Sequence, residues 1–322
     1  MSLASDHDID LIYQKSLRKR KNMRRLWLAF LLLPPILMLL IFVFLPMASA
    51  VLYSVYDWKG LVRGEFIGLG NYYDVLFKPR ESWFLFNAFK NNVVVFISLM
   101  IVQNGLALVL ALLLARKPAG YRFYQVVIFL PVILSTVIIG FQWKLFLNPI
   151  FGLVNKFLRM VDLDMWALPW LGLPETALGS MILVNTWHWV GFPTLVFLAA
   201  IHRIPKDLIE AARLDGANEW RIARDIIWPL MAPAVTIIVV LTFIGSFNWF
   251  EIPFIMGSLE GSPAYSTDTL GLLFYRTAFG SVSAGGSNFG AGSALAVLIF
   301  IFIFTFSIIV TKYLTSREIE MG

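Results

Sequence analysis

Residues 204–229 read IPKDLIEAARLDGANEWRIARDIIWP. Pro205 suits the first turn of a helix, where its missing N–H costs nothing, and the acidic Glu210 suits the positive N-terminal half of that helix. Gly216 suits the left-handed position that ends a helix, and Asn218 can cap the helix that follows. The stretch therefore predicts two short helices with a break at Gly216.

This stretch lies between two long apolar segments, and similar segments recur along the chain. The hydrocarbon core of a bilayer is about 30 Å thick and needs about 20 apolar helical residues per crossing. Of the 322 residues, 59% are hydrophobic and only 14% are charged, whereas about a quarter of a soluble domain is charged. We therefore expect an all-α polytopic membrane protein with about six transmembrane helices. These helices are expected at residues 27–53, 93–115, 121–147, 177–201, 228–255 and 291–314.

The distribution of positive charge predicts the orientation of the chain. Most of the 26 Lys and Arg residues lie in residues 1–26 and in the connections on the same side of the membrane. Cytoplasmic loops are enriched in these residues, so both termini are expected in the cytoplasm. The basic run in residues 1–26 is interpreted as a topology anchor that touches anionic headgroups of the lipid bilayer. A nucleic-acid-binding arm is the alternative, and no nucleic-acid partner is expected.

Three long connections are expected on the outer side, at residues 54–90, 148–176 and 256–290. The last of them is rich in Gly and Ser and is expected to be irregular. Residues 152–162 place apolar side chains at helical spacing, which predicts a short helix lying on the outer surface of the membrane.

Polar side chains inside the apolar segments are candidates for a solute pathway, because such groups are costly in a bilayer and usually face the bundle interior. Their mixture with tryptophan suits a sugar, which has hydroxyls and an apolar ring face. The candidates are Asn185, Trp187, His188, Trp189, Gly191, Thr194, Thr242, Ser246, Asn248, Trp249 and Glu251. As alternatives, Glu251 lies solvated at the outer end of its segment, and His188 and the tryptophans lie in an interfacial belt. Gln103 and Asn104 are interpreted as partners in interhelical hydrogen bonds rather than as ligands.

Catalytic and metal-binding patterns are missing from the sequence. It has no cysteine, and its three histidines are dispersed. It also lacks the Gly-x-x-x-x-Gly-Lys-Ser/Thr pattern that cradles nucleotide phosphates. We expect no catalytic residue, no metal site and no cofactor in this chain.

The loop at residues 204–229 resembles a known motif. Glu210-Ala211-Ala212, followed by Gly216 and by Trp228-Pro229, resembles the EAA loop of the membrane subunits of binding-protein-dependent ABC importers. Further resemblance to this family lies in Trp143–Asn155, Gly191-Phe192-Pro193, Gly245-Ser246-Phe247-Asn248, Thr267-Asp268-Thr269-Leu270 and Tyr275–Phe279. Together these segments are similar to the carbohydrate-uptake branch, and within it to the first permease subunit of maltose and glycerol-3-phosphate importers.

The resemblance implies a type I ABC importer permease in the inner or plasma membrane of a prokaryote. Its partners would be a second permease subunit, an ABC ATPase dimer that binds ATP and Mg, and an extracytoplasmic substrate-binding protein. Contact with the ATPase is expected from Glu210, Ala211, Ala212, Asp215, Gly216 and Ala217. The expected substrate pathway comprises His188, Trp189, Val190, Gly191, Thr194, Ser246, Phe247, Asn248, Trp249 and Glu251.

The same resemblance divides the chain into four parts. They are a basic cytoplasmic tail (1–26), a first transmembrane helix with its outer loop (27–90), a core permease domain (91–316) with a cytoplasmic coupling loop (204–227), and a second cytoplasmic tail (317–322).

The expected function is the passage of a carbohydrate from the binding protein into the cytoplasm, with ATP hydrolysis in a separate subunit, so the chain itself is not an enzyme. Sugars, oligosaccharides and glycerol-phosphate-like solutes all remain open. An ion-coupled secondary transporter of a small polar solute is the alternative, but it would require buried carboxylates and often inverted repeats. A membrane-embedded enzyme would require converging catalytic groups, and the sequence shows none.

Overall fold

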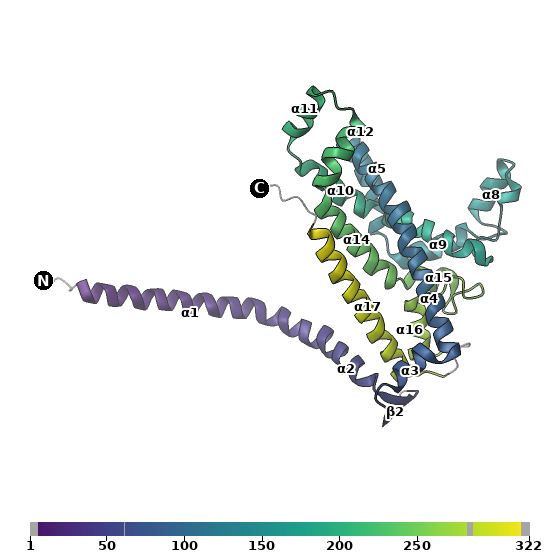
Figure 1. The fold of residues 1–322 in the computed structure, drawn as a ribbon, viewed down its shortest axis with the longest axis horizontal. Helices are drawn as coiled ribbons and strands as arrows, with labels where there is room; N and C mark the ends of the chain where they lie inside the picture. The colour runs from purple at the N-terminus through teal and green to yellow at the C-terminus, as the bar shows by residue number, and fades with distance from the viewer. Residues whose placement is uncertain (1–5, 61, 282–285, 317–322) are drawn as a thin grey trace. The chain divides into compact units, whose positions relative to one another are not determined.

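The computed structural model describes the backbone of residues 6–60, 62–281 and 286–316, almost all of it helical (Figure 1). The described chain divides into two compact units between Tyr53 and Ser54. Three of its helices are long and apolar enough to cross a membrane, or up to six if each of three bent helix pairs counts as one crossing. The expected all-α fold with about six apolar crossings is therefore confirmed.

The first unit is one helical rod. It comprises α1 (Asp6–Leu39), a π-helical turn η1 (Leu40–Phe44) and α2 (Leu45–Tyr53). The π-helical turn ends two residues before Pro46, whose missing N–H and bulky ring disturb the preceding turn of a regular helix. The helix begins at Asp6, so the backbone of the basic segment before residue 27 continues the first crossing without a break.

The second unit begins with structure that the sequence did not predict. Strands β1 (Tyr56–Lys59) and β2 (Val62–Phe66) form an antiparallel hairpin, and α3 (Gly70–Phe77) follows it. The next crossing comprises α4 (Pro79–Ser98), the π-helical turn η2 (Leu99–Gln103) and α5 (Asn104–Ala115). This crossing was expected to begin at residue 93. It begins at Pro79 because proline suits a first helical turn and residues 80–92, a mixture of polar and aromatic residues, continue the helix beyond the apolar part.

The remaining crossings contain breaks. A bend of 95° separates α6 (Tyr121–Ile133) from α7 (Thr136–Phe146), and one of 46° separates α9 (Pro174–Trp189) from α10 (Gly191–Arg203). The fifth crossing bends by 71° at Met231, where α14 (Ala232–Phe247) begins. It was expected to continue to residue 255, but the helix ends at Phe247 and a separate helix, α15 (Glu251–Gly257), follows. The last crossing, α17 (Phe289–Thr315), is a single helix.

Short helices fill the connections. On one side, α8 (Leu153–Met160) and η3 (Asp164–Trp166) lie in the third connection, where a short helix was expected. Residues 256–290 were expected to be irregular, yet they contain α16 (Leu270–Phe279). At the other end of the unit lie α11 (Lys206–Leu214), α12 (Glu219–Ile222), η4 (Ala223–Ile227) and α13 (Trp228–Leu230). Figure 1 shows α11 and α3 at opposite ends of this unit.

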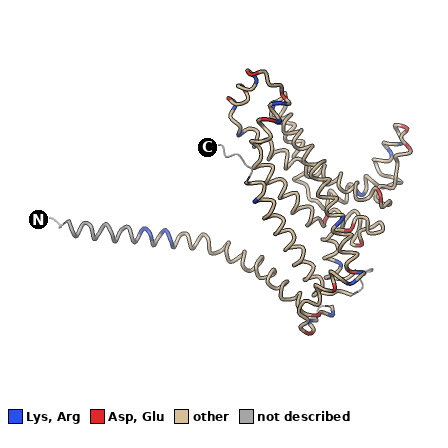
Figure 2. The backbone as a smooth tube through the Cα atoms, viewed as in Figure 1, with Lys and Arg blue, Asp and Glu red and all other residues tan. Residues whose placement is uncertain are grey.

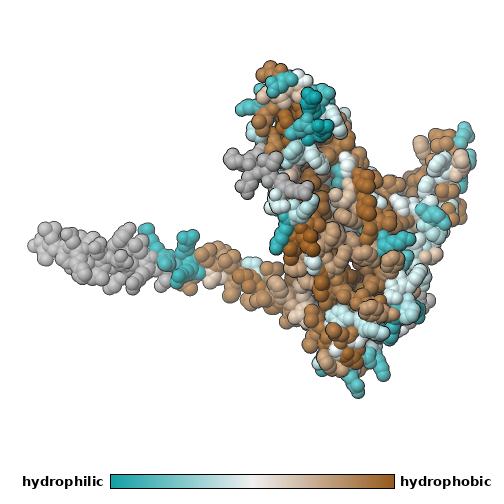
Figure 3. All heavy atoms as spheres, in the orientation of Figure 1, coloured by the Kyte–Doolittle hydropathy of each residue, from teal (hydrophilic) through white to brown (hydrophobic). Residues whose placement is uncertain are grey.

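The helices of the second unit pack through small and aromatic side chains. Ala107 and Ala111 of α5 are fully buried against α10, as small residues are at membrane helix interfaces. Phe243 of α14 stacks on Phe306 of α17, with ring centroids 3.8 Å apart. Charged residues gather mainly in the end connections (Figure 2), and apolar side chains cover much of the helical surface (Figure 3), as contact with lipid requires.

Candidate solute cavity and coupling loop

A cavity of about 590 Å³ lies where helix breaks of the second unit meet. Its volume falls within the usual range for small-molecule sites. Segments from η2, α5, α7, α9, α10 and α14, and from the chain between α14 and α15, contribute to its wall. The residues that line it include Gln103, Asn104, Thr136, Asn185, Trp189, Thr242, Ser246, Asn248, Trp249, Phe250 and Glu251. Among the described residues that line this cavity, none is Lys or Arg.

Five of the predicted pathway residues lie in this wall. They are Trp189, Ser246, Asn248, Trp249 and Glu251. Trp189 comes from α9 and Ser246 from α14, and the other three lie at the break that follows Phe247. The backbone leaves the helix after Phe247 and starts α15 at Glu251, which exposes Asn248 and Glu251. The break therefore brings a carboxylate and an amide to the same cavity.

Hydrogen bonds between helices hold the polar part of the wall. Asn185 Nδ2 donates to Gln103 Oε1 (3.1 Å), and Trp249 Nε1 donates to Asn185 Oδ1 (3.1 Å). Asn104 Nδ2 donates to Thr242 Oγ1 (3.0 Å). Gln103 and Asn104 thus make the interhelical bonds that were expected of them, and they also lie at the cavity surface. Because these amides are tied to each other, the wall is preorganised.

The other predicted pathway residues lie outside the cavity wall. His188 is fully buried, and its Nε2 lies 3.2 Å from the carbonyl of Leu134, where the third crossing bends. A carbonyl only accepts, so Nε2 carries the proton in this contact. His188 therefore satisfies a carbonyl freed by the helix break. Val190 ends α9, and the buried Thr194 donates its hydroxyl to the Val190 carbonyl (2.7 Å).

Gly191 and Phe247 have packing contacts instead of cavity contacts. A Cβ on Gly191 would lie 2.4 Å from the carbonyl oxygen of Ile128, so only glycine lets α10 approach α6 this closely. Phe247 is buried in an aromatic cluster, with its ring centroid 4.6 Å from that of Phe243 and 5.0 Å from that of Phe302.

The loop at residues 204–229 folds as its sequence predicts. Helix α11 ends at Leu214, Gly216 has φ +81°, and Ala217 N–H donates to the Ala212 carbonyl (2.9 Å). These are the features of a glycine-terminated helix. Asn218 Oδ1 accepts from Arg221 N–H (2.8 Å) and so caps α12.

The expected ATPase contacts are presented at the end of the unit. Glu210, Ala211, Asp215 and Gly216 are exposed, and Ala212 and Ala217 are half-buried. Glu219 pairs with Arg213 (3.1 Å) and with Arg116 at the end of α5 (3.5 Å). Leu214 and Trp220 are exposed apolar side chains beside these charges. A short helix with a small-residue face and exposed apolar neighbours is a suitable docking element for another protein.

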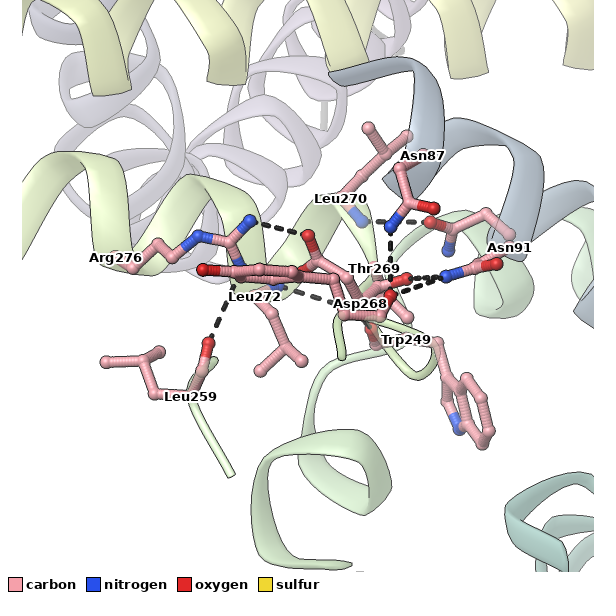
Figure 4. Close-up of polar contacts among 11 residues, drawn as sticks. Asn87, Asn91, Trp249, Leu259, Asp268, Thr269, Leu270, Leu272 and Arg276 are labelled. Atoms are coloured by element: carbon pink, nitrogen blue, oxygen red, sulfur yellow. Dashed lines mark hydrogen bonds and ion pairs between the residues drawn. The ribbon is translucent and has the colours of Figure 1, made fainter. Parts of the chain in front are cut away.

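A buried ion pair outside the predicted site fixes the loop between α15 and α16 (Figure 4). Arg276 of α16 donates to both carboxylate oxygens of Asp268, at 2.6 and 2.5 Å, and both side chains are almost fully buried. The guanidinium also lies over the ring of Phe84, 5.2 Å from its centroid. Burial raises the pKa of the Asp268 carboxyl above its ordinary value, and the hydrogen bonds and charge of Arg276 act in the opposite direction.

The sequence analysis did not single out Arg276 or its pairing with Asp268. The available signal was an acid and a base eight residues apart, in two neighbouring segments that resemble the family. Among the described residues, no three His, Cys, Asp or Glu side chains lie together as metal ligands.

Comparison with known proteins decides the family. A family model described as "Binding-protein-dependent transport system inner membrane component" matches residues 103–319. The chain belongs to this family. The expected identity as a multi-pass ABC importer permease of the inner membrane, a translocation component rather than an enzyme, is thereby confirmed.

Several members of this family are similar over most of their length. The probable ABC transporter permease protein YurN of Bacillus subtilis is 33% identical over 78% of this chain and 85% of its own. AmyD of Thermoanaerobacterium thermosulfurigenes, a probable starch degradation products transport system permease protein, is 29% identical over 92% and 96% of the two chains. The trehalose/maltose transport system permease protein MalF of Thermococcus litoralis is 29% identical over 87% and 91%.

A solved structure shares the fold of these permeases. The crystal structure of a bacterial ABC transporter that imports the acidic polysaccharide alginate matches with a TM-score of 0.77 and 24% identity, over 93% of this chain and 99% of that chain. The type I importer fold expected for this chain is therefore confirmed.

Proposed function

We propose that this permease passes a neutral carbohydrate through the membrane as one half of an ABC importer. The observation that carries the proposal is the cavity of about 590 Å³, whose lining combines two tryptophans with amide, hydroxyl and carboxylate side chains. Aromatic faces suit the apolar face of a sugar ring, and amides and carboxylates suit its hydroxyls. The relatives named for starch degradation products and for trehalose and maltose support the same solute class.

The charge of the wall favours a neutral solute over an anionic one. Sites for phosphate and carboxylate groups usually contain Arg or Lys, and the described wall contains neither. Glu251 contributes a carboxylate, which would repel an anion. A glycerol phosphate or an acidic sugar such as alginate therefore fits this wall less well than a neutral sugar.

Energy for transport would come from an ATPase dimer that binds ATP and Mg. In this proposal α11 docks on that ATPase through Glu210, Ala211, Ala212, Asp215, Gly216 and Ala217. Both termini and this loop would then lie in the cytoplasm, and the cavity would face a second permease across the solute path. An extracytoplasmic binding protein would deliver the sugar on the opposite side.

Affinity purification from native membranes tests the partner assignment. The wild-type subunit should bring an ATPase, a second permease and a binding protein, and Glu210→Lys should lose the ATPase while keeping the permease. A wild-type subunit that purifies alone and moves solute without ATP would refute the importer and favour an ion-coupled transporter.

Uptake by the purified importer in proteoliposomes tests the solute class. Radiolabelled maltose, trehalose, maltodextrin, glycerol 3-phosphate and alginate oligosaccharides are suitable probes. We expect uptake of at least one neutral sugar, and we expect Glu251→Gln to alter its apparent KM. The matched control is Glu175→Gln, an exposed carboxylate in the first turn of α9 that does not line the cavity. Uptake of the anionic probes alone would contradict the proposal.

A further inference from the structure

The loop between α15 and α16 is fastened to α4 by a row of asparagines (Figure 4). Asn87 Nδ2 donates to the carbonyl of Tyr265 (2.9 Å), and Asn91 Nδ2 donates to the carbonyl of Asp268 (2.9 Å). The buried pair of Asp268 and Arg276 holds the same loop from the side of α16. This loop is therefore held from both sides, by the buried Asn91, Asp268 and Arg276 and by the half-buried Asn87.

Two further contacts run from this network to the cavity wall. Asn92 is fully buried; its Nδ2 donates to the Ser246 carbonyl (2.5 Å) while its Oδ1 accepts from Leu270 N–H (2.8 Å). The equally buried Thr269 donates its hydroxyl to the Trp249 carbonyl (2.9 Å). Ser246 and Trp249 both line the cavity.

These two acceptors lie at the break of the fifth crossing. The last carbonyls of a helix have no partner within the helix. Since α14 ends at Phe247, the Ser246 carbonyl is one of these, and Trp249 lies in the non-helical chain before α15. Buried carbonyls that lack water must find another donor. Asn92 and Thr269 are these donors, one on each side of Asn248. The backbone that carries Asn248 toward the cavity is therefore held at both ends by side chains that do not touch the cavity.

We infer that Asn92 and Thr269 are positioning residues for the solute site, which they link to the loop between α15 and α16. Through the backbone of residues 246–249 they set the directions of Asn248 and Glu251, and Asp268 with Arg276 keeps Thr269 and Leu270 in place. The inference rests on the proposed function, because it assigns a solute to this cavity. A displaced loop would change the cavity wall without any contact between loop and solute.

A cysteine reporter tests this link without knowledge of the solute. The chain contains no cysteine, so Asn248→Cys gives a single thiol on an exposed cavity residue. Its rate of modification by a membrane-impermeant maleimide is measured in the purified importer complex. We expect Asn92→Asp, which removes the donor but keeps the acceptor, and Thr269→Val to change that rate about fivefold, as the loss of one buried hydrogen bond would. Thr269→Ser should restore the wild-type rate.

Asn87→Ala is the matched control, because it deletes a half-buried amide of the same helix that donates only to the Tyr265 carbonyl, and Asn91 Nδ2 still donates to that carbonyl (3.4 Å). It should leave the labelling rate unchanged. In cysteine-free importers that transport a sugar, Asn92→Asp and Thr269→Val should also raise the apparent KM about fivefold with little change in maximal rate.

Wild-type labelling rates in both Asn92→Asp and Thr269→Val would overturn the inference. The inference would also fail if these two variants lowered only the yield of assembled complex, because a purely structural role predicts that result. It would fail as well if Asn87→Ala changed the labelling rate as much as they do. An importer that transports no sugar would refute the proposed function instead, and the labelling rates would still decide whether the loop between α15 and α16 positions the wall.

Discussion

Breaking the pair of Asp268 and Arg276 should destabilise the permease strongly. The two side chains are only 0% and 2% exposed, so removing either one leaves a charge that water cannot reach. Loss of one partner from a buried pair costs about 3–5 kcal/mol, and we expect this cost for Arg276→Met. Asp268→Leu should cost about as much, because it leaves the guanidinium unpaired. Arg276 variants also lose the contact with the Phe84 ring, which contributes about 2 kcal/mol when desolvated.

Combining the two substitutions should recover much of the loss. Asp268→Leu with Arg276→Met leaves no buried charge, and replacing a buried pair by apolar residues is often close to neutral. The double variant should therefore be more stable than either single variant, with a coupling energy of about 2 kcal/mol or more. Unfolding of the purified subunit by SDS in mixed micelles, analysed by linear extrapolation, measures these differences.

The exposed pair of Lys78 and Asp74 provides the control. Its side chains are 53% and 38% exposed, and such pairs contribute about 0–1 kcal/mol. Lys78→Met should therefore have almost no effect. If Arg276→Met were as mild as Lys78→Met, or if the double variant were as unstable as the sum of the single ones, the argument from burial would be wrong.

Three further substitutions test other parts of the structure. Gly191→Ala should lower the midpoint of thermal unfolding and cost about 1–3 kcal/mol, because its Cβ would lie 2.4 Å from the Ile128 carbonyl oxygen. Gly216→Ala should strain the end of α11 by about 1 kcal/mol, since φ there is +81°, and should reduce recovery of the ATPase in the purification described above. Met160→Cys on α8, labelled with bimane in nanodiscs, should be quenched by spin-labelled lipid, because Met160 is an 80% exposed apolar residue of a helix predicted to lie on the membrane.

Each of these predictions has its own control. Gly179→Ala should be tolerated, because no atom lies within 4 Å of its added Cβ; equal losses at Gly191 and Gly179 would refute the close-approach argument. Gly216→Asn should retain the ATPase, because asparagine also adopts the left-handed conformation, and full recovery with Gly216→Ala would show that this geometry is unimportant. An Arg159→Cys label, at an exposed position on the polar side of α8, should be quenched less than the Met160 label. If the label at Met160→Cys were shielded only after a binding protein is added, and were not quenched by lipid before, α8 would be a protein-binding helix and not a membrane-surface helix.

Local features of this protein could be predicted from the sequence alone. The apolar segments were recognisable because a bilayer imposes a length and a composition on each crossing helix. The break at Gly216 and the cap at Asn218 depend on residues within one turn of each other, so neighbouring residues were enough to predict them. The pattern from Glu210 to Pro229, read as a resemblance, identified the family that the comparison then confirmed.

Features that depend on contacts between distant segments were decided only by the tertiary structure. The fifth crossing looked continuous to residue 255, but it ends at Phe247, where Asn92 and Thr269 supply the donors for the freed carbonyls. His188, predicted as a pathway residue, lies outside the described cavity wall and contacts a carbonyl at the bend of another crossing. Each of these outcomes follows from one requirement: a buried polar group must find a partner, and that partner lies far away in the sequence.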